Sequence, residues 1–323
     1  MPADKTNDKE PDRIIRVGSR DSALALAQDE EVIAPLRVHH PDLEFEIVTV
    51  RTSGDVNQSA PLAGMGLGIF VKELEQELLN GDLDMAIHSL KDMPTKLPKG
   101  LMLGAILPRK DARDVLVNRW NCTIEDLPKG ARIGTSSPRR TAQLMKNAPQ
   151  VTVIPIRGNV GTRLRKVQGE EADGAVLAAA GLIRLGLADS VAEYLSPRRF
   201  VPAPGQGILA VEIRADDQRV QDILKPIEDA STRYEATAER AFLELIGGGC
   251  QLPVGAYARC MGDELLITIF MSSEDGSTVF TAKIEGLKHD PLQLATDAYL
   301  AVVERGGHDL VKAVRPQQEY TSF

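Results

Sequence analysis

The sequence predicts an α/β protein with two similar lobes on mixed, mainly parallel sheets, followed by a smaller C-terminal α+β domain with an antiparallel sheet. Strands alternate with amphipathic helices through the first two thirds of the chain, which favours parallel pairing with helices on both sheet faces. A strand, a turn of small residues and a helix occur in the same order twice. After about Ser231, successive strands are joined by short turns instead.

The first lobe begins with a β-branched strand, Ile14 to Val17, followed by the turn Gly18 to Ser22 and an apolar-rich helix from Ala23 to about Leu36. An acidic turn at 81–84 then precedes the buried strand Met85 to Ile87. Helix starts offer unpaired N–H groups, so the first turn has the layout of an anion site.

The second lobe repeats this order. The segment Arg132 to Arg140 leads into a helix through Met145, with Pro138 suited to the first helical turn. A strand over Val151 to Ile156 follows, and a second acidic turn at 169–173 precedes another buried strand. We therefore expect ligands to bind at the carboxyl ends of the strands of both lobes.

Two crossovers and a change of pattern set the expected domain bounds. Two segments are candidate hinges. One is the polar stretch at 108–114, and the other is Pro202 to Gly207, which precedes the apolar strand Ile208 to Ile213. The expected domains are 1–107 with 205–228, then 108–204, then 229–323. In the last, a capping box at Thr232 to Glu235 starts a helix. Strands at 254–260, 265–271 and 278–284 and a helix at 291–304 complete it.

Composition excludes several classes of protein. The formal charge of −8 disfavours nonspecific nucleic-acid binding, which depends on Lys and Arg neutralising phosphates. The longest apolar run, Ala175 to Ile183, is far shorter than the roughly 20 residues that span a bilayer. Met1 to Arg13 resembles neither a signal nor a transit peptide. Three scattered cysteines predict neither a disulfide framework nor a metal site, and the cytoplasm is the expected compartment.

Basic and hydroxyl side chains cluster at three helix starts. Ser19 to Ser22, Thr135 to Arg140 and Arg157 to Arg163 each combine backbone N–H groups with hydroxyls or guanidinium groups that suit carboxylates. One such cluster is equally well explained as a capped helix with solvated arginines. Three together indicate a ligand with several carboxylates or phosphates between the lobes.

Asp92 follows a strand in the segment His88 to Pro94, where it could act as an acid, a base or an electrostatic stabiliser. From local sequence alone, an aspartate in a turn is the commoner explanation, and His88 is expected to be structural. The segment Gly64 to Gly68 lacks the spacing of a dinucleotide loop and is interpreted as a flexible loop.

Cys250 lies in the glycine loop Gly247-Gly248-Gly249-Cys250-Gln251-Leu252-Pro253. A free cysteine is usually an inert small hydrophobe. The position after a helix that ends near Ile246 disfavours a thiolate, which argues against a turnover nucleophile. A single slow attachment reaction would tolerate it. Cys122 and Cys260 have no comparable setting.

The chain closely resembles the porphobilinogen deaminases, also called hydroxymethylbilane synthases. The resemblance runs from about Ile14 to the C-terminal helix. It is densest in eight segments: 18–26, 70–74, 88–94, 134–140, 157–163, 180–182, 204–207 and 248–253. It implies lobes like those of periplasmic binding proteins, a cytoplasmic monomer, and no nucleic-acid or membrane partner.

The resemblance also implies the chemistry. Four porphobilinogen molecules are condensed into a linear tetrapyrrole with release of ammonia, on a dipyrromethane primer joined to Cys250 through a thioether. Asp92 is then the catalytic carboxylate. The residues implied to bind cofactor or substrate are Arg20, Ser22, Ser89, Lys91, Asp92, Thr135, Ser136, Ser137, Arg139, Arg140, Arg157, Gly158, Arg163 and Gln206. Arginine forks suit carboxylates better than lysine does.

One segment departs from the family pattern, because 63–69 lacks the lysine usual before Phe70. We expect its glycines to keep it mobile and any charge to come from Lys72 or elsewhere. Two other functions are alternatives for a two-lobed chain with anion-binding clusters. A two-lobed solute-binding protein would not explain Cys250 and would carry an export signal. A ligand-sensing regulator would need a DNA-binding module, of which the sequence has no sign.

Overall fold

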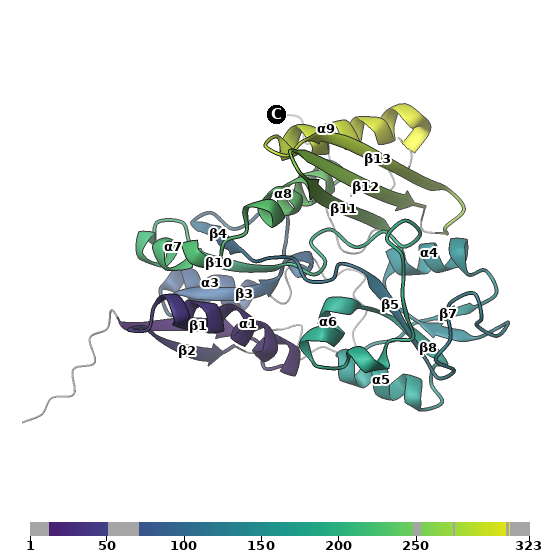
Figure 1. The fold of residues 1–323 in the computed structure, drawn as a ribbon, viewed down its shortest axis with the longest axis horizontal. Helices are drawn as coiled ribbons and strands as arrows, with labels where there is room; N and C mark the ends of the chain where they lie inside the picture. The colour runs from purple at the N-terminus through teal and green to yellow at the C-terminus, as the bar shows by residue number, and fades with distance from the viewer. Residues whose placement is uncertain (1–12, 51–70, 248–252, 274, 308–309, 311–323) are drawn as a thin grey trace, which may run out of the picture.

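The computed structural model describes residues 13–50, 71–247, 253–273, 275–307 and 310. These residues form three sheets, each with its own helices (Figure 1). We call the unit around the first sheet lobe 1, the unit around the second lobe 2, and the C-terminal unit domain 3. Figure 1 shows the lobes side by side, with domain 3 packed above them.

Lobe 1 contains a described sheet with strand order β2-β1-β3-β10-β4. Strands β1 and β2 are parallel, as are β1 and β3, whereas β10 is antiparallel to both β3 and β4. The strands are β1 (Ile14–Ser19), β2 (Glu44–Thr49), β3 (Met85–Ser89), β4 (Leu101–Ile106) and β10 (Leu209–Arg214), and the helices are α1 (Ala23–His39), α3 (Lys72–Asn80) and α7 (Gln218–Leu224). Short 3-10 turns lie at Leu90–Asp92 and Lys225–Ile227.

Lobe 2 has a described sheet with strand order β7-β6-β8-β5-β9, in which β5 is antiparallel to its neighbours. The strands are β5 (Asp114–Asn118), β6 (Arg132–Gly134), β7 (Thr152–Ile154), β8 (Gly174–Ala178) and β9 (Glu193–Tyr194), and the helices are α4 (Pro138–Asn147), α5 (Val160–Gln168) and α6 (Ala179–Arg184). A 3-10 turn lies at Ala188–Ser190. The predicted mixed, mainly parallel lobes are confirmed.

Two crossovers join the lobes, and each one leads directly into the antiparallel strand of the lobe it enters. The first, at 107–113, leads from β4 into β5, and the second, at 201–208, leads back from lobe 2 into β10. They lie beside each other, since the Lys110 amide donates to the Gly207 carbonyl at 3.1 Å. Gly207 has a φ of 88°, and a side chain there would meet the Lys110 carbonyl oxygen at 2.9 Å.

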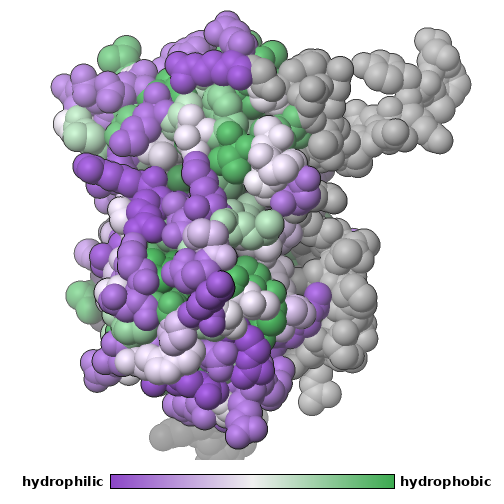
Figure 2. All heavy atoms as spheres, turned by 90° about the vertical axis from the view of Figure 1, so that its right-hand side faces the viewer, coloured by the Kyte–Doolittle hydropathy of each residue, from purple (hydrophilic) through white to green (hydrophobic). Residues whose placement is uncertain are grey.

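Domain 3 is a three-stranded antiparallel sheet, β11-β12-β13, with two helices packed on it. Its elements are α8 (Ala230–Leu245), β11 (Val254–Met261), β12 (Glu264–Ser272), β13 (Val279–Leu287) and α9 (Pro291–Val302), which continues as a π turn, Val303–Gly307. The predicted antiparallel domain is confirmed. Figure 2 shows the face made by domain 3 and lobe 2, where hydrophilic side chains predominate and apolar ones are scattered.

The predicted start of α8 is wrong by three residues. The helix begins at Ala230, and its cap is Asp229, whose side chain accepts a hydrogen bond from the Thr232 amide at 2.7 Å. Aspartate is as strong a cap as threonine, and starting at Asp229 adds helical hydrogen bonds. Thr232 is instead 5% exposed, and its hydroxyl accepts from the Arg109 amide at 3.2 Å in the first crossover.

A buried ion cluster fastens domain 3 to the crossovers. Arg109 donates to Glu239 at 2.7 Å and to Glu235 at 3.1 Å, both on α8. Glu239 also accepts from the amides of Gly205 and Ala258, at 2.6 and 2.7 Å. Glu239 therefore holds the second crossover and β11 against the same helix. The domain bounds predicted from the sequence stay a prediction.

Candidate active site

The predicted site residues of lobe 1 lie at one edge of its sheet. Because β1 and β3 are parallel neighbours, the residues after Ser19 and those from Ser89 onward emerge together. Ser22 caps α1 by accepting from the Ala25 amide at 3.1 Å. Ser89 accepts from Gln28 at 2.8 Å, which links the end of β3 to α1. Arg20 is half-buried at the same edge.

The predicted site residues of lobe 2 share an edge in the same way, because β6 and β7 are parallel. Several of the hydroxyls already have local partners. Ser137 caps α4, Thr135 accepts from the Ser137 amide at 3.1 Å, and Ser136 donates to the Ile156 carbonyl at 2.9 Å. These contacts shape the turn, whereas the guanidinium groups that follow it carry the charge.

A cavity of about 160 Å³ lies where lobe 1, lobe 2, the second crossover and domain 3 meet. Its walls come from all four parts of the chain, and six of the predicted site residues line it. The lining residues are Lys91 and Asp92, Ser137, Arg139 and Arg140, Ala203, Pro204 and Gln206, and Leu243 and Val254. The structure thus brings predicted residues from both lobes together in one place.

Two of the predicted arginines are buried rather than solvated. Arg139 and Arg140 are 4% and 7% exposed, and both donate to Asp114, each at 2.7 Å. Burial alone would raise the pKa of Asp114, but the two guanidinium groups overcome it and hold that pKa well below its usual range. Asp114 thus fixes both guanidinium groups at the cavity wall. The three side chains together carry one net positive charge.

Asp114 is a residue that the sequence analysis missed. It begins β5, and it is fully buried, although the sequence placed it in a polar crossover. An aspartate at the start of a β-branched strand, in a protein with paired arginines elsewhere, is the only sequence signal for it. Nothing in its immediate neighbours shows which arginines it meets.

Further positive charge lies close to these two arginines. Lys91 is half-buried, and burial lowers its pKa, with the Asp92 carboxylate partly opposing the shift. Burial also lowers the pKa of Arg163 to about 10, and the neighbouring Arg140 adds to the effect, while Asp92 opposes it. Arg163 donates to the Gly158 carbonyl at 2.8 Å. Cations held this close to one another suit a ligand with several carboxylates.

Asp92 ends the 3-10 turn after β3, and its side chain is exposed at the cavity. The second crossover supports this turn, since Gly205 has a φ of 74° and a side chain there would meet the Lys91 amide nitrogen at 3.0 Å. The Leu90 amide donates to the Ile208 carbonyl at 3.0 Å. Asp92 is therefore an accessible carboxylate on a tightly packed turn.

Gln206 places a hydrogen-bond acceptor at the same cavity. Its amide nitrogen donates to the Ala112 carbonyl at 2.7 Å and to Asp114 at 3.0 Å, which fixes the orientation of the amide. Its side-chain oxygen is buried and has no hydrogen-bond partner among the described residues. A buried acceptor of this kind suits an N–H group of a ligand.

Cys250 lies outside the described residues, as does the segment 63–69. The described residues on either side of Cys250 are nevertheless informative, since Leu243 and Val254 both line the cavity. In the sequence, Val254 follows Cys250 by four positions, and Leu243 precedes it by seven.

The other two cysteines have structural contacts. The Cys260 thiol donates to the Ser231 carbonyl at 3.4 Å, and burial raises its pKa. Cys122 lies near the Asn118 side chain, 3.7 Å from its oxygen. His88, which was expected to be structural, is buried and contacts Glu212 at 3.1 Å.

A contact between the lobes adds a second missed residue, Arg184. It lies at the end of α6 and contacts Glu31 of α1 at 3.0 Å, and Glu31 also accepts from Lys110 at 2.7 Å. Arg184 further donates to the Gly207 carbonyl at 3.2 Å. This cluster joins both lobes to both crossovers.

Comparison with known proteins identifies the family. The family model described as "Porphobilinogen deaminase, dipyromethane cofactor binding domain" matches residues 15–222, and "Porphobilinogen deaminase, C-terminal domain" matches 233–301. The chain belongs to the porphobilinogen deaminase family. The porphobilinogen deaminase of Syntrophus aciditrophicus is 42% identical over 94% of this chain and 100% of its own length. That of Carboxydothermus hydrogenoformans is 43% identical over 93% and 96%.

Membership of the porphobilinogen deaminase family confirms the predicted enzyme class and the dipyrromethane cofactor. Among solved structures, the methionine binding protein MetQ has a TM-score of 0.41 and 14% identity over 71% of this chain and 95% of its own. At that TM-score the likeness adds nothing to the strand orders above. No helix in the described ranges is long and apolar enough to cross a bilayer.

Proposed function

We propose that this enzyme condenses four porphobilinogen molecules head to tail into the linear tetrapyrrole hydroxymethylbilane, with release of ammonia from each. The observation that carries the proposal is the cavity where the two lobes, the second crossover and domain 3 meet, because Asp92, Arg139 and Arg140 line it together. Each porphobilinogen unit brings two carboxylates and a pyrrole N–H group. The cavity presents cations for the former and acceptors for the latter.

Asp92 is proposed as the catalytic carboxylate. Loss of ammonia from the aminomethyl group leaves positive charge on the pyrrole, and a carboxylate beside the ring stabilises that charge as it develops. Asp92 is exposed at the cavity on a turn that Gly205 packs against, so it is available to substrate and held in position. The oxygen of Gln206 is proposed as a second acceptor for pyrrole N–H groups.

The cationic residues are proposed to hold the carboxylates of cofactor and substrate. Lys91, Arg139 and Arg140 line the cavity, and Arg163 is close enough for the Asp92 carboxylate to oppose the lowering of its pKa by burial. The rest of the proposed set lies at the two sheet edges and consists of Arg20, Ser22, Ser89, Thr135, Ser136, Ser137, Arg157 and Gly158. A growing chain adds negative charge, which these residues offset in a protein of net charge −8.

The described residues fit a dipyrromethane, because the cavity combines three cations with a buried acceptor that has no partner among them, and because Leu243 and Val254, on either side of Cys250 in the sequence, line it. We propose that Cys250 holds the cofactor through a thioether. When bound, the cofactor supplies the free α-position to which each new unit is joined. A cytoplasmic, monomeric enzyme without nucleic-acid or membrane partners is part of the same proposal.

The attachment is tested by the intact mass of the purified protein. We expect an excess corresponding to two linked pyrroles, which Cys250→Ser removes. Cys122→Ser and Cys260→Ser are matched controls that replace the other two cysteines and should keep the excess mass. An unmodified mass in active wild-type protein would show that the attachment is wrong.

Asp92→Asn tests the catalytic role, because asparagine keeps size and hydrogen bonding but removes the charge. We expect turnover to fall about 100-fold or more, as for loss of one electrostatic stabiliser of a transition state. Asp82→Asn, an exposed aspartate of the same lobe, is the control and should leave turnover unchanged. Near wild-type turnover in Asp92→Asn would exclude the assigned role.

A further inference from the structure

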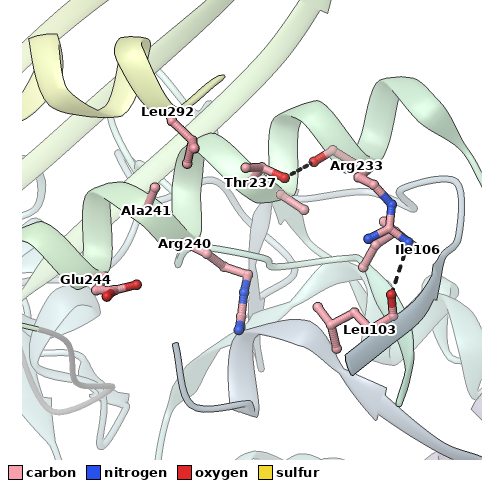
Figure 3. A pocket seen from close by; sticks show the side chains of 9 residues that line it. Leu103, Ile106, Arg233, Thr237, Arg240, Ala241, Glu244 and Leu292 are labelled. Carbon is pink, nitrogen blue, oxygen red and sulfur yellow. Dashed lines mark hydrogen bonds between the residues drawn. The ribbon is translucent and has the colours of Figure 1, made fainter. Parts of the chain in front are cut away.

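A second cavity, of about 190 Å³, lies between lobe 1 and domain 3 and shares no lining residue with the catalytic cavity (Figure 3). It is bounded by α8, by β4 and by the first turn of α9. Nothing in the proposed reaction uses it. Its lining combines an apolar pocket with a guanidinium group that forms no ion pair with any carboxylate of the described residues.

Most of the wall is apolar. Leu103 and Ile106 come from β4, Ala236 and Ala241 from α8, and Leu292 from α9. Figure 3 shows Leu292 above α8 and Leu103 below it, on opposite sides of the cavity. Leu292 is 60% exposed, so the cavity has an opening beside α9. A compact apolar group would bury this surface, which favours binding at roughly 25 cal/mol per Å².

Arg240 supplies the charge. Its guanidinium group points from α8 toward lobe 1 (Figure 3), where one terminal nitrogen donates to the carbonyls of Pro94 and Thr95 at 2.8 and 3.0 Å. Arg240 forms no ion pair within 4.0 Å in the described part of the chain, and its printed partners are these two neutral carbonyls. Burial lowers the pKa of Arg240, and the more distant carboxylates of Glu212 and Glu244 only partly oppose that shift.

The other charged residues at the cavity are already paired. Arg233 donates to Glu228 at 2.8 Å, and Glu244 contacts Lys96 at 3.5 Å. Arg240 is therefore the charged residue at the cavity with which a ligand could form a direct ion pair. A carboxylate is the natural partner, because guanidinium groups bind carboxylates through paired N–H donors.

From these features we infer that the cavity binds a small organic carboxylate with a compact apolar body, of the size of a one-ring aromatic acid. The size follows from the volume, since pockets for drug-sized ligands are about 300–1,000 Å³ and this one is smaller. The apolar body lies against Leu103, Ile106 and Leu292, and the carboxylate meets Arg240.

The position of Arg240 gives such a ligand access to the catalytic residues. Pro94 and Thr95, whose carbonyls Arg240 binds, follow Asp92 by two and three residues. The same helix, α8, ends at Leu245, five residues after Arg240, and the segment that carries Cys250 follows that end. A carboxylate that takes over Arg240 N–H groups competes with these carbonyls and loosens the segment after Asp92. We therefore expect the ligand to lower turnover, a consequence that rests on the function proposed for Asp92.

Binding is tested with benzoate as the probe and benzamide as its uncharged counterpart, on the intact enzyme with its cofactor. Calorimetry should show benzoate binding at least tenfold more tightly than benzamide. Arg240→Gln should weaken benzoate at least tenfold. Ala241→Leu, which fills the cavity and leaves Arg240 in place, should do the same and decides the matter if Arg240→Gln does not fold. Crystals with 4-iodobenzoate should show iodine beside Leu103.

Arg163→Gln distinguishes this cavity from the catalytic one. Benzoate binding that is lost in Arg163→Gln but unchanged in Ala241→Leu would place the probe at the catalytic cavity and overturn the inference. Absence of benzoate binding would overturn it too. None of these readouts needs turnover, so failure of the proposed reaction would not mimic their failure. In kinetics, benzoate should reduce the turnover of the wild type but not that of Ala241→Leu; equal effects on both would refute the coupling to Asp92.

Discussion

Replacing Asp114 with asparagine tests the buried charge cluster on which the catalytic cavity depends. Asp114 is fully buried and is the shared carboxylate of Arg139 and Arg140, which are themselves 4% and 7% exposed. The variant would leave both guanidinium groups buried without a countercharge. Removing one partner of a buried ion pair costs about 3–5 kcal/mol, because the remaining charge is left uncompensated. We expect a loss of this size in the free energy of unfolding.

The assay is urea unfolding at pH 7, with turnover measured in parallel. Asp216→Asn, an exposed aspartate of lobe 1, is the control and should change stability by no more than about 0.5 kcal/mol. In Asp114→Asn the guanidinium groups of Arg139 and Arg140 lose the carboxylate that holds them at the cavity, so turnover should fall as well. A variant within about 1 kcal/mol of the wild type and with normal turnover would refute the reasoning.

The effect also has a defined pH dependence. The folded-state pKa of Asp114 is depressed, so its contribution is fully present above the unfolded-state pKa of about 3.9. It is lost as the pH falls below that value toward the folded-state pKa. The stability difference between the wild type and Asp114→Asn should therefore be constant from pH 5 to 8 and shrink in acid. A difference that grew in acid would contradict the assignment.

Two further changes test other buried features. Burial raises the pKa of Asp29 to about 6, so the folded state loses stability as the pH rises from about 4 to about 6. Asp29→Asn should thus raise the free energy of unfolding, measured in urea, by about 1–3 kcal/mol at pH 8 and by little at pH 4, and equal gains at both would contradict this. Gly207→Ala should cost at least about 1 kcal/mol more than Gly186→Ala, because both have positive φ but only Gly207 meets a carbonyl oxygen. Equal thermal unfolding temperatures for the two variants would contradict this, because they would show that the crossover shifts to accommodate the added methyl group.

Local patterns in the sequence were sufficient to predict the elements that carry the site. The turn Gly18 to Ser22 precedes α1, and the segment Arg132 to Arg140 leads into α4 with Pro138 in its first turn, as predicted; the structure adds that a serine caps each helix. Such a prediction depends on neighbouring residues alone, since the cap, the first turn and the strand before them are contiguous. The same holds for the antiparallel strands of domain 3.

Contacts between distant residues could not be predicted in this way. Arg139 meets Asp114 only because β5 enters lobe 2 as an antiparallel strand beside β8. Glu31 and Arg184 are 153 residues apart and meet because the crossovers bring α1 to α6. The free oxygen of Gln206 follows from the two acceptors that fix its amide. These are tertiary features, and no single segment encodes them.

The paired crossovers also determine the order in which the lobes can be completed during synthesis. All strands of lobe 2 lie between Asp114 and Tyr194 in the chain. Lobe 1 has its β4 joined to the rest of its sheet only through β10, which ends at Arg214. Domains usually fold in the order in which they leave the ribosome. Here the sheet of lobe 1 cannot be completed until β10 has been synthesised, and β10 follows all of lobe 2 in the chain.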